Sequence, residues 1–300
     1  MAGIAGVLLL ATGLAAARGE AFLHNGVVRS YELVVPPGLA LPAPALVLLH
    51  GGGGSGRQLR DHIGFEDFAA EAGVIGVFPD SVERLWNDGR TSPDLADAQA
   101  RAGDDAGFIV ALVDALAAAG VVDAGRVGVG GISNGGMMTL RLACVAPGRF
   151  VAFAVVAANM AVGIECPQGP PAPMLFVHGS EDPIIRYGGG PIIIPLAPGR
   201  VRGTALPVPE TLAIWAQRNG CGSPPALHAR LDLRPFDGTA VAIYDYPGCR
   251  ANLRHILIEG GGHAWPGARQ RLLGLLSGRT SREIDATVAI WAFVTAQSSR

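Results

Sequence analysis

The segment GGISNGG, residues 130–136, places one serine, Ser133, among four glycines. It follows RVGVGG, which has the character of a strand, and it precedes GMMTLRLACVA, which has helical spacing. Side chains flanking a serine in such a tight strand-to-helix turn would collide with the neighbouring strand and helix, and Gly131 and Gly135 avoid this. The context indicates that Ser133 is a nucleophile held at the carboxyl edge of a sheet. The alternative is an inert serine N-cap in a glycine-rich turn.

Strands and helices alternate along the chain on both sides of this turn. PALVLLH and VIGVFPD are continuous apolar runs of strand length, whereas RQLRDHIGFEDFAAEAG and DDAGFIVALVDALAAAG have helical spacing. Fully apolar strands that alternate with helices predict a mostly parallel central sheet covered by helices on both faces. The 300 residues are 49% apolar and 16% charged, which fits one well-filled α/β domain as well as two smaller ones. No internal repeat and no Ser/Thr- or Pro-rich linker divides the sequence, so we expect one domain over residues 18–300.

Charge and motif spacing argue against several classes of partner. The net charge is −2 and no Lys/Arg tract occurs, so neither nucleic acid nor an anionic membrane is an expected partner. GxGxxG fails after Gly128 because Ser133 stands at its third glycine position, and GGGGSGRQ lacks the lysine of a phosphate-binding loop. The chain also has no CxxC or HExxH, so we expect no cofactor and no metal ion. A small-molecule or oligomeric substrate remains.

The first residues predict export. Residues 1–17 are small or apolar, too few to span a bilayer comfortably, and Ala15 to Ala17 supply the small-residue pattern at which a signal peptidase cleaves. We therefore expect a signal peptide over 1–17, a secreted (extracellular or periplasmic) protein, and no membrane insertion after cleavage. The alternative is an apolar strand or helix packed on the domain.

Four cysteines agree with export. Of the three possible connectivities we favour the two short-range pairs, Cys144 with Cys166 and Cys221 with Cys249. Each would close a loop of about twenty to thirty residues and contribute ~3 to 4 kcal/mol by restricting the unfolded chain. Four reduced, buried thiols are the alternative in a cytoplasmic protein.

A serine hydroxyl needs a base and an acid, and candidates follow Ser133 in the chain. With the order serine, acid, histidine, the base is one of His178, His228, His255 and His263. His263 lies in a loop, EGGGHAWPG, after the last strand, and is our choice. Asp182 ends the strand MLFVHGSEDP and would hold the imidazole in the correct tautomer. Its neighbour Glu181 competes for that role, and turn capping is the structural alternative for Asp182.

The glycine run LLHGGGGSG follows an early strand, where an oxyanion loop is expected. Glycines expose backbone N–H groups without obstruction, and such donors stabilise the tetrahedral intermediate of acyl transfer. We expect the N–H groups of Gly52 and Asn134 to be these donors.

Three features are candidates for the substrate cleft. Trp86 and Trp265 could form aromatic walls for a feruloyl or sugar ring, with plain packing as the alternative. Residues 183–209 are rich in Pro and Gly, so we expect an irregular loop at the rim of the cleft.

Several motifs together resemble the secreted polyhydroxybutyrate depolymerase and feruloyl esterase family of α/β-hydrolases. They are LLHGGGGSG, DDAGFIVALVDAL, GISNGGMMTLRLAC, FVHGSEDPIIRYGGG, WAQRNGC and GGGHAWPG. The resemblance implies the α/β-hydrolase fold, with Ser133 as nucleophile, Asp182 as acid and His263 as base. It also implies a disulfide between Cys221 and Cys249. Depolymerase members often carry Cys where this chain has Gly52, which favours the esterase side of the family.

We therefore predict a secreted serine esterase that forms an acyl-enzyme and acts on carboxylic esters of the feruloyl, acetyl-polysaccharide or hydroxyalkanoate-oligomer type. An acyltransferase or a peptidase with the same triad is the alternative within enzymes. From a different class, the chain could be a hydrolase-fold binding protein that has lost turnover.

Overall fold

The computed structural model describes residues 18–90, 103–166, 169–194, 200–222, 224–269 and 276–298. Its main feature is a sheet of 10 strands in the order β1-β2-β4-β3-β5-β6-β7-β12-β11-β10. The strands of the centre, from β4 to β12, pair in parallel. They are β4 (Ile75–Pro79), β3 (Ala43–Leu49), β5 (Val122–Ile132), β6 (Ala152–Val156), β7 (Met174–Gly179) and β12 (Leu253–Glu259). The predicted parallel centre is confirmed.

Antiparallel strands complete both edges of the sheet. At one edge are β1 (Arg18–His24) and β2 (Val27–Val34), and at the other are β11 (Ala240–Asp245) and β10 (Ala226–Leu231). The predicted signal peptide, residues 1–17, lies outside the described residues. No helix in the described ranges has the length and apolar character needed to cross a bilayer.

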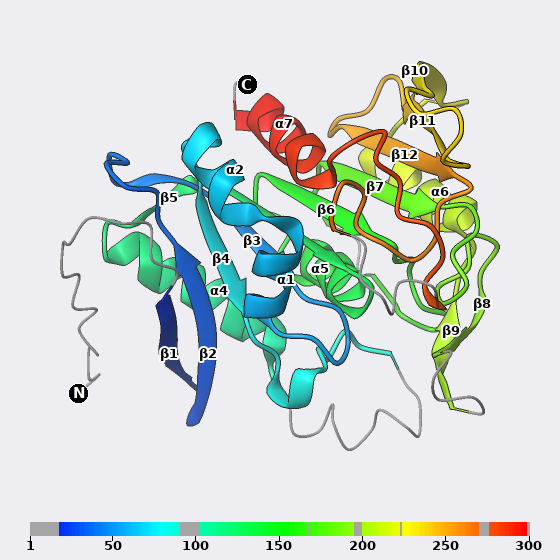
Figure 1. The fold of residues 1–300 in the computed structure, drawn as a ribbon. Coiled ribbons are helices and arrows are strands. Elements are labelled where there is room, and N and C mark those ends of the chain that lie inside the picture. The colour runs from blue at the N-terminus through cyan, green and yellow to red at the C-terminus, as the bar shows by residue number, and fades with distance from the viewer. Residues whose placement is uncertain are drawn as a thin grey trace.

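Helices cover both faces of the sheet, as Figure 1 shows. Along β3, Leu46 and Leu48 pack with the helices of one face, whereas Val47 and Leu49 pack with those of the other. The first face carries α1 (Gly56–Ile63), α2 (Phe65–Ala72) and α7 (Ala286–Ser298), and the second carries α4 (Asp105–Ala118), α5 (Asn134–Val145) and α6 (Val208–Asn219).

Two segments depart from the sequence-based expectation. The helix expected over RQLRDHIGFEDFAAEAG is divided between α1 and α2 by Gly64, whose φ of 64° is left-handed and ends α1. In the stretch 183–209, expected to be irregular, β8 (Gly190–Ile193) and β9 (Val201–Ala205) form a separate antiparallel pair. Pro191 is compatible with this pairing because each strand of a two-stranded sheet is an edge strand.

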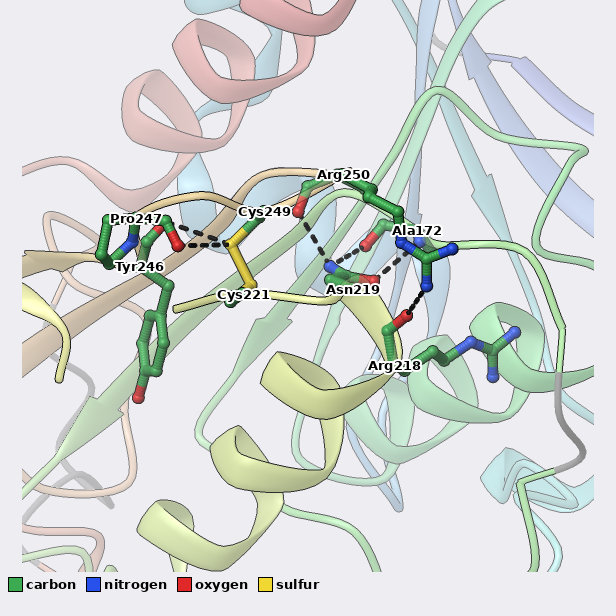
Figure 2. Close-up of a disulfide and its surroundings, with 9 residues drawn as sticks. Ala172, Arg218, Asn219, Cys221, Tyr246, Pro247, Cys249 and Arg250 are labelled. Atoms are coloured by element: carbon green, nitrogen blue, oxygen red, sulfur yellow. Dashed lines mark hydrogen bonds between the residues drawn. A yellow bond between two sulfur atoms is a disulfide. The ribbon is translucent and has the colours of Figure 1, made fainter. Parts of the chain in front are cut away.

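Both predicted disulfides are confirmed. Cys144 in α5 is joined to Cys166, and Cys221, just after α6, is joined to Cys249 in the turn between β11 and β12. Figure 2 shows the second bridge with the buried amide of Asn219 beside it.

Asn219 links three segments around that bridge. Its Nδ2 donates to the carbonyl oxygens of Ala172 (2.7 Å) and Ala251 (3.1 Å), and its Oδ1 accepts from the N–H of Ala172 (3.0 Å). Ala172 and Ala251 precede β7 and β12, so the disulfide and the amide together fix the amino ends of these two strands. The loops that follow the carboxyl ends of the same two strands carry Asp182 and His263.

Candidate active site

Ser133 occupies the sharp turn between β5 and α5, in a conformation that L-residues rarely adopt (φ 58°, ψ −122°). Its N–H donates to the carbonyl of Val156 on β6 (2.9 Å). The flanking glycines are required by close packing. A Cβ on Gly131 would lie 2.5 Å from the carbonyl carbon of Gly135, and one on Gly135 would lie 2.2 Å from the carbonyl oxygen of Leu49. The strand-turn-helix context predicted for Ser133 is therefore present.

Asp182 and His263 are joined by a hydrogen bond. His263 Nδ1 lies 2.7 Å from Asp182 Oδ2, and the aspartate side chain is fully buried whereas the histidine side chain is 10% exposed. The other oxygen, Oδ1, accepts from the backbone N–H groups of Ile184 (2.8 Å) and Ile185 (2.9 Å). Both carboxylate oxygens are thus occupied, and one of them orients the imidazole.

All three predicted triad residues follow strands that end at the same edge of the sheet. Ser133 follows β5, Asp182 follows β7 and His263 follows β12, and β6 is the one strand between β5 and β7. The loop that carries His263 contacts the segment that follows β7, because the N–H of Glu181 donates to the carbonyl of Gly261 (2.9 Å). Among the described residues, the Ser133 side chain has no hydrogen-bond partner, so the structure pairs the acid with the base but does not join the serine to the base. Catalytic hydrogen bonds are often long or unmade until substrate binds.

The glycine run after β3 lies against Ser133 and Asn134. A Cβ on Gly51 would lie 3.3 Å from Ser133 Cβ, and one on Gly52 would lie 3.7 Å from Asn134 Cβ. Asn134 is the first residue of α5, where backbone N–H groups have no acceptor within the helix. The two residues predicted to supply the oxyanion donors are therefore neighbours.

His50 holds this glycine loop, a role that the sequence did not indicate. Its Nδ1 lies 2.8 Å from the carbonyl oxygen of Gly51, and its Nε2 lies 3.2 Å from the backbone nitrogen of Ser81. Since a carbonyl only accepts and an N–H only donates, His50 carries its proton on Nδ1. Burial lowers the pKa of His50, which favours this neutral form. The order of triad residues left no role for a histidine upstream of the serine.

Both tryptophans predicted to form walls of the substrate cleft are buried, so that prediction is wrong. Trp86 is 0% exposed and donates its indole N–H to the carbonyl of His50 (2.9 Å), and Trp265 is 1% exposed and donates to Thr287 Oγ1 (3.1 Å). A buried indole satisfies its N–H inside the protein and offers no face to a ligand. Trp86 supports the glycine loop, whereas Trp265 anchors α7.

The side chain of Asn134 has a structural role that the sequence did not indicate. Its Oδ1 accepts from the N–H of Trp86 (2.8 Å), and its Nδ2 donates to Asp88 Oδ2 (2.7 Å). Asp88 is fully buried and is paired with Arg90 (2.8 Å). This network ties the first residue of α5 to the chain that follows η1 (Val82–Arg84). Only contacts between distant segments show it, because WNDGR alone has the composition of an ordinary turn.

A family model described as esterase PHB depolymerase matches residues 29–183 of the chain. The chain belongs to this esterase family. The putative esterase NocK of Nocardia uniformis subsp. tsuyamanensis is 31% identical over 269 residues, which cover 87% of this chain and 77% of the relative. A probable feruloyl esterase C of Aspergillus terreus is 27% identical, covering 81% of each chain. Membership confirms the predicted class of enzyme, a serine hydrolase of carboxylic esters.

A solved structure supports the fold of this esterase family member. The acetyl xylan esterase from Aspergillus awamori superposes with a TM-score of 0.56 at 18% identity, covering 88% of this chain and 94% of the other. At this identity the likeness concerns the fold alone, and the predicted α/β-hydrolase fold is confirmed.

One prediction for this esterase concerns its stability at low pH. His255 lies on β12 and is 4% exposed, and burial lowers its pKa to about 3. An unfolded histidine titrates near 6.5, so below that pH the unfolded chain binds a proton that the folded one does not, and stability falls as pH drops from about 6.5 toward 3. Between pH 7 and pH 5 the free energy of unfolding should fall by about 2 kcal/mol less in His255→Phe than in the wild type. Urea unfolding at both pH values measures this difference.

The matched control is His228→Phe, which removes a histidine whose side chain is 54% exposed. Because this side chain is exposed, its replacement should not reproduce the smaller loss expected for His255→Phe. If His255→Phe follows the wild-type curve as well, the neutral buried state assigned to His255 is wrong.

Proposed function

We propose that this protein is a secreted serine esterase in which Ser133, His263 and Asp182 form a catalytic triad. The observation that carries the proposal is the buried hydrogen bond between Asp182 and His263 at the sheet edge where the strained Ser133 turn projects. Together with membership of an esterase family, this favours an enzyme over a binding protein of the same fold.

In the proposed reaction, Ser133 Oγ attacks the ester carbonyl carbon and its proton passes to His263 Nε2. Asp182 accepts the Nδ1 proton as a hydrogen bond and stabilises the imidazolium. The carbonyl oxygen becomes an oxyanion that accepts hydrogen bonds from the N–H groups of Gly52 and Asn134. The imidazolium then protonates the leaving alcohol. Water attacks the acyl-enzyme with His263 as base, which releases the acid and restores Ser133.

The proposed substrates are esters of the feruloyl, acetyl-polysaccharide or hydroxyalkanoate-oligomer type. Similarity to a probable feruloyl esterase supports the first, and the description of the family supports the last. Gly52, at a position where depolymerase members often have Cys, favours the esterase side of the family.

Secretion is part of the proposal. Two disulfides fit an oxidising compartment, because cytosolic thiols are kept reduced. Residues 1–17 would be the signal peptide and residues 18–300 one catalytic domain.

A substrate panel tests the proposal. The purified protein is expected to hydrolyse p-nitrophenyl butyrate and to show a clear kcat/KM preference among methyl ferulate, acetylated xylan oligomers and 3-hydroxybutyrate oligomers. A p-nitrophenyl alkylphosphonate should label one serine, identified as Ser133 by peptide mass. The matching butyryl anilide tests for a peptidase and should be cleaved far more slowly. Absence of both turnover and labelling would contradict the proposed function.

A further inference from the structure

A second histidine, His178, faces the carboxylate of Asp182. It lies on β7 with a side chain that is 2% exposed, and its Nε2 is 3.5 Å from Asp182 Oδ2. The same nitrogen is 2.8 Å from the carbonyl oxygen of Ile185. Because that carbonyl can only accept, Nε2 carries the proton and donates to Ile185.

The surroundings of His178 favour a neutral ring. Burial lowers the pKa of His178, and the positive charge that His263 acquires acts in the same direction. The Asp182 carboxylate and the carbonyl groups of Ile185 and Ala158 oppose this shift. Two further titratable rings complete the environment. Tyr187 meets His178 edge-on with ring centroids 6.0 Å apart. The ring centroid of Tyr187 also lies 6.0 Å from that of His255 on β12.

Ile185 is held on both sides by groups that also contact each other. Its N–H donates to Asp182 Oδ1 (2.9 Å), and its carbonyl accepts from His178 Nε2 (2.8 Å). This closes the turn over residues 182–185 and fixes the rotation of the carboxylate. With Oδ1 bound by backbone N–H groups, Oδ2 is the oxygen that meets His263 Nδ1.

We propose that His178 is a positioning residue that, as a neutral Nε2–H imidazole, locks the 182–185 turn so that Asp182 Oδ2 stays aligned with His263. His178 does not touch the reacting atoms. Because Asp182 and His263 act only in the proposed function, this role of His178 rests on it.

The first test uses the wild-type protein labelled with ¹⁵N in its histidine rings. At pH 8 the His178 resonances should report a neutral ring protonated at Nε2. A His178 that carries its proton on Nδ1 at this pH, or that is protonated on both nitrogens, overturns the proposal.

The second test compares His178→Leu with His178→Gln. Leucine cannot donate to Ile185, so the carboxylate should rotate away from His263. A misplacement of about 1 Å can cost ~10²-fold in rate. We expect kcat for p-nitrophenyl butyrate to fall by about that factor with KM within threefold of wild type. Glutamine retains an N–H donor and should recover at least tenfold in kcat.

A folded His178→Leu with wild-type kcat overturns the role, as does a folded His178→Gln that is as impaired as His178→Leu. His228→Leu, at an exposed histidine, should change neither kcat nor KM. If His178→Leu has no cooperative thermal transition, the proposal is tested by the ring resonances of the wild type and by the kcat of His178→Gln. Phosphonate labelling of Ser133 distinguishes failure of the positioning role from failure of the proposed function. If Ser133 is labelled but the His178 variants keep wild-type kcat, only the positioning role is rejected. If Ser133 is not labelled, the proposed function is rejected.

Discussion

Replacing Ser133 with alanine is expected to lower kcat/KM for p-nitrophenyl butyrate by about 10⁵- to 10⁶-fold, the scale on which loss of a triad serine acts. Alanine has no oxygen to attack the carbonyl carbon, and neither His263 nor Asp182 can replace it. The donors proposed at Gly52 and Asn134 would remain, which is why a residual rate above that of water is expected. Initial rates measure the effect, with the wild type diluted until its rate is comparable to that of the variant.

Ser30→Ala is the matched control, since Ser30 is an exposed serine on β2. It should keep wild-type activity. Ser133→Ala should show the wild-type thermal transition, because the Ser133 side chain has no hydrogen-bond partner among the described residues. Ser30→Ala removes only an exposed hydrogen bond to Asp80 Oδ2 (2.8 Å), so its transition should change little. Activity of Ser133→Ala within a hundredfold of wild type would show that the strained turn does not carry the nucleophile.

The sequence was sufficient wherever a local pattern determines a structure. The apolar run PALVLLH, residues 44–50, predicted a buried strand, and the structure has β3 at Ala43–Leu49. The glycines around Ser133 predicted a turn that tolerates no side chain. Ser133, Asp182 and His263 each follow a strand of the parallel centre, and parallel strands have their carboxyl ends on the same side of a sheet. Their positions after these strands were therefore enough to predict that the acid and the base lie close together. Short separations also gave the disulfide pairs, because closing a short loop costs the least entropy.

Contacts between distant segments were not accessible in this way. An indole beside a predicted catalytic histidine looks the same in sequence whether it faces a cleft or the core, and Trp265 faces the core because Thr287 on α7 accepts its N–H. His50 fixes the glycine loop through Ser81, which follows a different strand. The β8–β9 pair forms although its segment is rich in Pro and Gly, because mutual pairing satisfies backbone groups that composition alone leaves unassigned.

Gly135→Ala is expected to destabilise the protein by about 3 kcal/mol or more, at the upper end of overpacking effects. The added Cβ would lie 2.2 Å from the carbonyl oxygen of Leu49 and 2.5 Å from that of His50, and both are backbone atoms of the sheet edge. Alanine favours a helix over glycine by only ~1 kcal/mol, so the collision dominates. Urea unfolding followed by circular dichroism measures the loss, and Tm should fall by roughly 6 to 12 °C.

Gly148→Ala separates this collision from any general effect of replacing glycine. A Cβ on Gly148 meets nothing within 4 Å, and its φ is not left-handed, so stability should change little. To accommodate alanine at 135, α5 must move away from β3, and the move would carry Ser133 and the N–H of Asn134 with it. Activity should therefore fall together with stability in Gly135→Ala, by about 10²-fold for a displacement near 1 Å. A Gly135→Ala protein as stable and active as Gly148→Ala would mean that α5 and β3 do not approach as closely as the glycine requires.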